Sequence, residues 1–241
     1  MGKTVSLSNT VRSWINLVTS LQGCKHDVDT WQKVLQLRSL VISPGEDAPS
    51  YIKFANLCRK ERRWNLAESV IQQLLSDQSK QDAPIRASPA VVFTHLRLLW
   101  DTGDKEDSLR YLINVCASLA RDIGLDDPGR VITGNLEEVE EVRKLLSRAY
   151  LKQGEWRQEL QPDWTPTSIN EVVQCYQIAT QLNPKWYKAW HTWALCNFEV
   201  INHLENVDDD RDEETQRKAL LSHILAAVVG MCPSTYTDHI S

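Results

Sequence analysis

The sequence predicts an all-α protein made of helical hairpins stacked one on the next. Apolar residues recur at helical spacing along nearly the whole chain, and no stretch shows the alternation typical of strands. A pattern of helix, short turn and helix also recurs, with comparable turns at 58–64, 99–105 and 151–156. The turns are spaced irregularly, and further apart than the ~34 residues of a regular tetratricopeptide repeat. We therefore expect a right-handed α-solenoid of tetratricopeptide-like hairpins with loops of variable length.

Proline and glycine set the expected ends of the helices in the first half of the chain. The run Ser43-Pro44-Gly45 should stop the first helix, because proline disfavours helix in the residue before it. Ser88 followed by Pro89 is typical of an N-cap and first helical residue. The expected helices are one between Asp29 and Ser43, followed by 49–60, 65–76, 89–100 and 105–122.

The second half is expected to contain helices over 136–152, 169–181, 184–204 and 212–229. Gly154 should end the first of these, because glycine commonly closes a helix, and two prolines in 155–168 exclude one long helix there. The predicted organisation is a poorly assigned helix or tail at 1–20, the solenoid at 21–204, an acidic loop at 205–214, a further helix at 215–230 and a disordered tail at 231–241.

The expected helix at 184–204 is unusually aromatic. Three of the nine tryptophans share one of its faces at i, i+4 and i+7: Trp186, Trp190 and Trp193. Tyr187 and Phe198 continue the aromatic surface round the side, and Leu195 faces roughly opposite the tryptophans. A helix that is apolar on more than one side is usually packed between other helices. We therefore expect this helix to lie inside the stack.

Composition narrows the class of protein. The chain is 42% hydrophobic and 24% charged, as in ordinary globular proteins, and has no apolar run long enough to span a membrane. Its net charge of -5 is concentrated in the acidic run at 205–214, so the balanced remainder gives no electrostatic footprint for nucleic acid. The six cysteines are scattered singly and the histidines form no ligand pattern. We expect buried, reduced thiols and no metal site.

Motifs for catalysis do not occur in the sequence. It has no phosphate-binding loop, no dinucleotide fingerprint and no nucleophile elbow. No catalytic residue is predicted, and the chain by itself is not expected to be an enzyme.

Several cations lie beside apolar stripes on successive expected helices. Arg148 and Lys152 are one turn apart, Lys60 precedes the first turn, Arg97 belongs to the helix that ends at residue 100, and Lys188 emerges from the aromatic helix. Converging cations repel one another, so such a cluster would need a polyanion or acidic partners. Spacing alone leaves open the alternative of extended side chains with local salt bridges.

Five segments, in the same order, resemble the FAT region of the TOR protein kinases, in the phosphatidylinositol-3-kinase-related kinase family. They are LQGC at 21–24, WQKVLQLRSLVISP at 31–44, FANLCRK at 54–60, RAYLKQGEW at 148–156 and WYKAWHTWALCNFE at 186–199. The resemblance covers roughly residues 20–204, whereas 1–20 and 205–241 resemble the family only weakly.

The resemblance implies a tetratricopeptide-like solenoid that wraps a kinase domain as a clamp and carries a cationic pocket for inositol hexakisphosphate. The family's pocket cations correspond here to Lys60, Arg97, Arg148, Lys152 and Lys188, with Lys53 as a further contributor. Arg97 stands where lysine is common in the family, which preserves the charge but changes the contact geometry. No metal is implied.

These expectations describe a non-catalytic scaffold segment that supports TOR complex signalling of nutrients and growth. Its partners would be a kinase domain, other helical repeats and TOR complex subunits, in the cytoplasm or peripherally at the vacuolar or lysosomal membrane. The full-length family member would be a serine/threonine kinase. Kinase motifs do not occur here, so the chain is expected to be a fragment, a truncated product or a partial gene model. The alternative is a free-standing tetratricopeptide-type adaptor that binds a peptide or protein.

Overall fold

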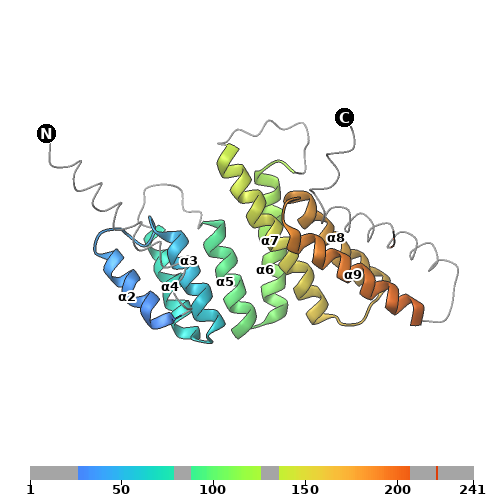
Figure 1. Ribbon diagram of the computed structural model, residues 1–241, viewed down its shortest axis with the longest axis horizontal. Helices are drawn as coiled ribbons and strands as arrows, with labels where there is room; N and C mark the ends of the chain where they lie inside the picture. The colour runs from blue at the N-terminus through green and yellow to red at the C-terminus, as the bar shows by residue number, and fades with distance from the viewer. Residues whose placement is uncertain (1–26, 79–87, 126–135, 207–220, 222–241) are drawn as a thin grey trace. The chain divides into compact units, whose positions relative to one another are not determined.

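The computed structural model describes residues 27–78, 88–125 and 136–206, together with residue 221. All regular secondary structure in these ranges is α-helical, which confirms the predicted fold class (Figure 1). The chain divides into two compact units, the first ending at Leu98 and the second beginning at Leu99. The predicted segments 1–20 and 231–241 lie outside the described residues, and 205–214 and 215–230 lie almost wholly outside them. None of the described helices is both long enough and apolar enough to cross a bilayer.

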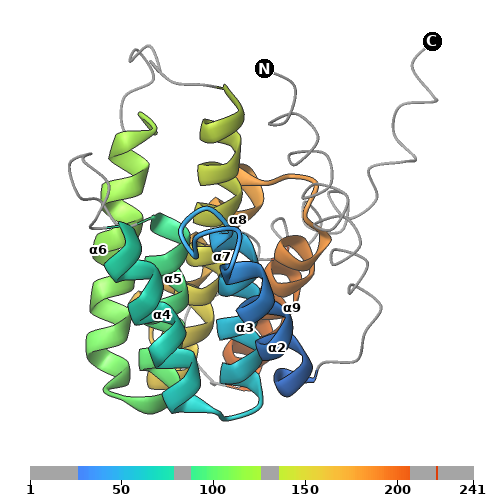
Figure 2. The same cartoon turned by 90° about the vertical axis from the view of Figure 1, so that its left-hand side faces the viewer.

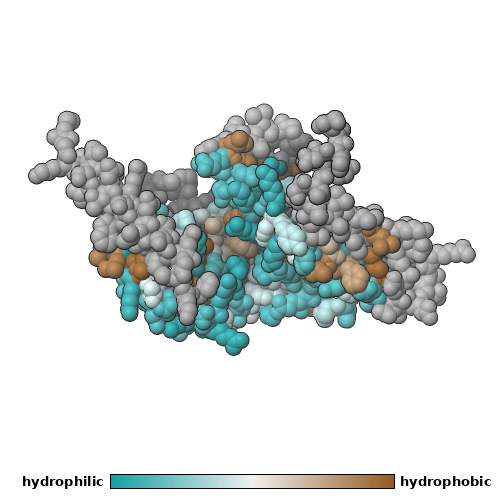
Figure 3. All heavy atoms as spheres, in the orientation of Figure 1, coloured by the Kyte–Doolittle hydropathy of each residue, from teal (hydrophilic) through white to brown (hydrophobic). Residues whose placement is uncertain are grey.

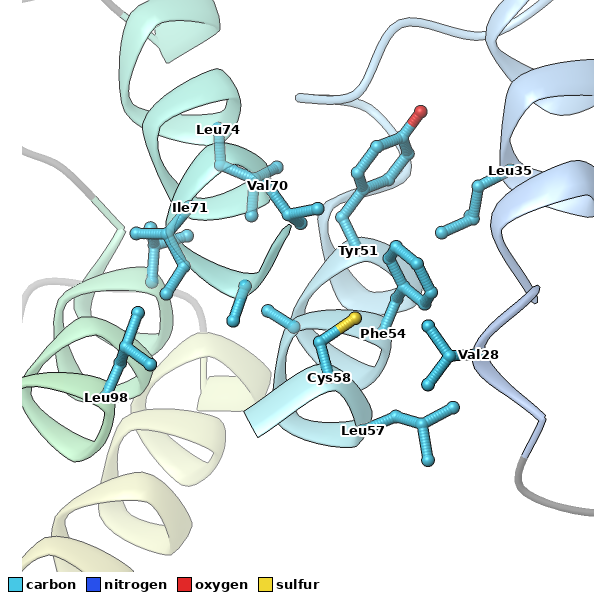
Figure 4. Packing of buried hydrophobic residues seen from close by; sticks show 13 residues of the cluster. Val28, Leu35, Tyr51, Phe54, Leu57, Cys58, Val70, Ile71, Leu74 and Leu98 are labelled. Atoms are coloured by element: carbon cyan, nitrogen blue, oxygen red, sulfur yellow. The ribbon is translucent and has the colours of Figure 1, made fainter. Parts of the chain in front are cut away.

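The first unit consists of helices that follow one another along the chain: α2 (Val28–Ser39), α3 (Ala48–Lys60), α4 (Trp64–Gln78) and α5 (Pro89–Thr102), the last up to Leu98. α3 packs against both α2 and α4. Figure 4 shows the resulting core, in which Phe54 and Cys58 of α3 lie between Leu35 of α2 and Ile71 of α4. This packing of one helix on its sequence neighbours is what a helical repeat predicts.

Local signals fix the ends of these helices. The carboxylate of Asp27 caps α2 by accepting hydrogen bonds from the N–H groups of Asp29 and Thr30, each at 3.2 Å. Between α3 and α4 the chain reverses in a tight turn in which Arg62 has a φ of 57°. The turn predicted at 58–64 is therefore confirmed, although α3 occupies its first residues.

The second unit continues the pattern with longer helices: α6 (Lys105–Asp122), α7 (Leu136–Leu160), α8 (Pro166–Leu182) and α9 (Tyr187–Asn206). Each of these helices packs against the next in sequence. α6 is seen from the side in Figure 2. α8 begins with a capping box, in which Ser168 N–H donates to Thr165 Oγ1 at 3.2 Å and Thr165 N–H donates to Ser168 Oγ at 2.9 Å. The buried core of this unit is formed mainly by α8 and α9.

α7 is longer than predicted. The expected end at Gly154 is wrong, because the helix continues without a break to Leu160, and residues 151–156 are therefore helix interior and not a turn. An ideal Cβ placed on Gly154 would lie only 2.4 Å from Cε1 of Tyr176, a fully buried residue of α8. Glycine here permits close approach of α7 and α8, which is the usual reason for glycine inside a helix.

The aromatic helix α9 buries only one of its faces. Trp193 is 4% exposed, and Trp186 and Trp190 pack against the same core cluster. On other faces Tyr187, Leu195 and Phe198 remain about half exposed, at 60%, 49% and 57%. Hydrophobic atoms are visible at the surface of α9 in Figure 3. Of the three tryptophans, Trp193 is thus buried and Trp186 and Trp190 are partly buried, but the expected packing on both sides of α9 is not found among the described residues.

The four cysteines in the described ranges are free and buried, as predicted: Cys58, Cys116, Cys175 and Cys196. Burial raises the pKa of the Cys58 and Cys175 thiols to about 11 and those of Cys116 and Cys196 to about 12. The reactive thiolate is therefore scarce at neutral pH.

We expect these thiols to react with Ellman's reagent only after unfolding. The test uses a chain carrying Cys24→Ser and Cys232→Ser, so that only the four buried thiols remain. In native buffer no thiol should be modified rapidly, whereas all four should react in guanidinium chloride. Rapid labelling of the native chain would contradict the packing described for these residues.

Candidate anion-binding residues

One pocket of the first unit brings together three of the predicted cations. It has a volume of about 380 Å³ and is lined by Trp31, Lys53, Asn56, Leu57, Lys60 and Arg97. The residues from α3 fall at i, i+3, i+4 and i+7, so helical geometry alone places them on one face. Trp31 is contributed by α2, and Arg97 by α5. The size is within the range of small-molecule sites, and the lining combines positive charge with one aromatic wall.

Within this pocket Arg97 is held by its neighbours. Its Nη1 donates a hydrogen bond to Asn56 Oδ1 at 3.0 Å, and its guanidinium carbon lies 5.8 Å from the centre of the Phe93 ring. Asn56 Nδ2 in turn donates to the carbonyl of Ile52 at 2.8 Å, which fixes the orientation of the amide. Asn56 therefore positions the arginine that lines the pocket.

Lys53 and Lys60 have a different environment. Both side chains are exposed, and neither forms an ion pair with another described residue. Their charges are thus available to a ligand without displacing a carboxylate of the described chain. Sequence reasoning identified both lysines, but it missed Trp31, Asn56 and Leu57. Of these, Asn56 and Leu57 lie on the predicted face of α3 between the two lysines, so the helical spacing could have revealed them.

The remaining predicted cations belong to the second unit. Lys152 on α7 and Lys188 on α9 contact the same carboxylate, that of Glu155: Lys152 Nζ pairs with Oε2, and Lys188 Nζ lies 3.5 Å from Oε1. Arg148 is exposed one turn before Lys152. Local salt bridges, which the spacing left open as the alternative, are therefore present for two of these cations.

The described residues give little support for a metal site or for a reactive side chain. No group of three or more histidine, cysteine, aspartate or glutamate side chains that could hold a metal ion occurs in the described ranges. The pKa of Tyr176 is raised, first by burial and then by neighbouring acidic groups. This phenol is buried in the core and its hydroxyl donates to Gln158 Oε1, which is a structural role.

The helical fold agrees with the similarity to known proteins. The FAT domain family matches residues 6–239, nearly the whole chain. The chain therefore belongs to the FAT domain family of helical-repeat proteins.

More particularly, the chain is similar to TOR kinases. It is 45% identical to the serine/threonine-protein kinase TOR2 of Saccharomyces cerevisiae over 205 residues, which is 81% of this chain and 8% of that protein. It is 33% identical to tor1 of Schizosaccharomyces pombe over 78% of the chain, and 32% identical to TOR of Arabidopsis thaliana over 76%, again 8% of each kinase. The chain thus spans about one twelfth of the length of these relatives.

Proposed function

We propose that this chain is a non-catalytic scaffold segment of a TOR-type serine/threonine kinase, and that its cationic pocket binds an inositol polyphosphate. The segment would clamp a kinase domain and support TOR complex signalling, in the cytoplasm or at the vacuolar or lysosomal membrane. Membership of the FAT domain family and similarity to TOR kinases support the scaffold role. In this proposal the segment is part of a longer polypeptide, which has the kinase activity, acts on the substrates and contacts the complex subunits.

The pocket at Trp31, Lys53, Asn56, Leu57, Lys60 and Arg97 carries the ligand proposal. The half-exposed pocket contains three cations, and neither of its lysines has a described acidic partner. A ligand with several phosphates matches this positive charge. Each phosphate monoester has a charge of about -1.5 to -2 at neutral pH and three acceptor oxygens. The guanidinium of Arg97 can donate to such oxygens in a fixed plane, whereas the lysines supply mobile point charges.

Inositol hexakisphosphate should raise the melting temperature of the 241-residue chain. A ligand that binds only the folded state stabilises it by mass action, and at ~100 times the dissociation constant the shift should be about 5–10 °C. Differential scanning fluorimetry at low and high salt measures it. Because the interaction is electrostatic, the shift should shrink as salt rises.

Charge-reversal variants locate the binding residues. Lys60→Glu should remove more than half of the shift, whereas Lys33→Glu, an exposed α2 residue that does not line the pocket, should leave most of it. For the second unit, Arg148→Glu/Lys152→Glu is compared with Arg143→Glu/Lys144→Glu, which makes the same charge change on the same helix. A shift that is absent in the wild type, or equal in Lys60→Glu and Lys33→Glu, would exclude the pocket as the site.

A further inference from the structure

The carboxylate of Glu155 contacts two of the cations predicted to bind the ligand. Its Oε2 pairs with Lys152 Nζ, one turn earlier on α7, and its Oε1 lies 3.5 Å from Lys188 Nζ on α9. The Glu155 side chain is 27% exposed, compared with 32% for Lys152 and 59% for Lys188. The least exposed member of the trio is thus the acid, and each of its oxygens faces one lysine.

This arrangement holds two like charges together in the absence of a ligand. It also places the carboxylate oxygens of Glu155 against the two ammonium groups, where the oxygens of a phosphate would otherwise bind. A phosphate oxygen at one lysine would lie about 5 Å from the carboxylate, and at an effective dielectric constant of ~20 two negative charges at that distance repel by several times the thermal energy. Both lysine–glutamate contacts are partly exposed to solvent, and ion pairs near the surface are weak, so the contacts can be broken.

We propose that Glu155 is an internal competitor for phosphate at Lys152 and Lys188, and so sets how tightly this part of the chain binds an inositol polyphosphate. The inference rests on the proposed function and extends it from the pocket of the first unit to Lys152 and Lys188, the predicted ligand-binding cations of the second unit. A multiply charged phosphate displaces the carboxylate, whereas a ligand with little charge does not. Lys53 and Lys60 contact no described acid, so neither lysine of the first-unit pocket has such a competitor among the described residues.

The direction of the expected effect separates this role from a merely structural one. If Glu155 only positioned the two lysines, its removal would weaken binding. If it competes with phosphate, its removal strengthens binding. Glu155→Gln tests this because the amide preserves the size and shape of the side chain but removes its charge.

Isothermal titration calorimetry with inositol hexakisphosphate provides the measurement, on the full 241-residue chain at low salt. Glu155→Gln should bind about tenfold more tightly than the wild type, which corresponds to ~1.4 kcal/mol. The control is Glu159→Gln, also on α7, whose carboxylate pairs with Lys105 at 2.5 Å and touches none of the predicted cations. It should change the dissociation constant less than twofold.

The outcomes distinguish this inference from the function on which it rests. If the wild type binds and Glu155→Gln binds no more tightly than Glu159→Gln, the competitor role is overturned while the polyphosphate site stands. If none of the three chains binds, the proposed site itself fails, and the inference with it.

Discussion

Trp156→Ala is expected to reduce the free energy of unfolding of the second unit by about 3–5 kcal/mol, the range measured when a buried tryptophan or phenylalanine is truncated. Trp156 is 2% exposed, and its ring stacks in parallel on that of Trp100, with centroids 4.2 Å apart. Truncation removes both the buried area and this stacking partner. Globular proteins are stable by only about 5–15 kcal/mol, so much of the stability would be lost.

Urea denaturation followed by far-UV circular dichroism measures the effect without relying on tryptophan fluorescence. Trp156→Phe retains an aromatic ring against Trp100 and should cost less than half as much. The double variant Trp100→Ala/Trp156→Ala should be less destabilised than the sum of the two single variants, because each single variant already removes the stacked pair. Additive costs would show that the two rings do not stabilise each other.

Gly154→Ala is expected to cost about 1–2 kcal/mol, although alanine is the better helix former. The gain in helix propensity is about 1 kcal/mol, whereas overpacking of a filled core typically costs 1–3 kcal/mol and occasionally more. At 2.4 Å from Cε1 of Tyr176 the new methyl group cannot be accommodated unless α7 and α8 separate. The steric term should therefore exceed the propensity term.

Two further variants isolate this steric term. Arg143→Ala, at an exposed position of the same helix, should change stability by no more than about 0.5 kcal/mol. In a Tyr176→Leu background, which removes the ring, the additional cost of Gly154→Ala should fall below about 1 kcal/mol. An unchanged midpoint for Gly154→Ala in the wild-type background would mean that the two helices are not in close contact there.

The success of the sequence predictions depended on how local the signals are. The helix at 105–122 was predicted with the bounds observed for α6, because its Asp104 cap and its apolar spacing are both local. Ser88 and Pro89 likewise mark the start of α5. Gly154 was misread because glycine favours both helix termination and close helix packing. Tyr176, which decides between them, lies on another helix.

In the candidate site, too, some contacts follow from local spacing and others depend on the tertiary structure. Lys53 and Lys60 are two turns apart on α3, so their common face follows from spacing. The meeting of Arg97 with Asn56 depends on the packing of α5, which no local pattern encodes. The pairing of Glu155 with Lys152 was not predicted, although the two residues are three positions apart on α7 and this spacing is local. The contact of Glu155 with Lys188 requires the tertiary structure.

Glycine at position 154 has a consequence beyond the core. It immediately precedes Glu155, and the helix spacing that it permits sets how far the lysine of α9 must reach to meet that carboxylate. The 3.5 Å separation of Lys188 and Glu155 is near the outer limit of an ion pair, so a small outward movement of α8 and α9 would break it. A substitution at 154 that is tolerated for folding would therefore still alter the distance between Lys188 and Glu155. Under the proposed function, a residue that touches neither the ligand nor a charge would in this way change ligand affinity.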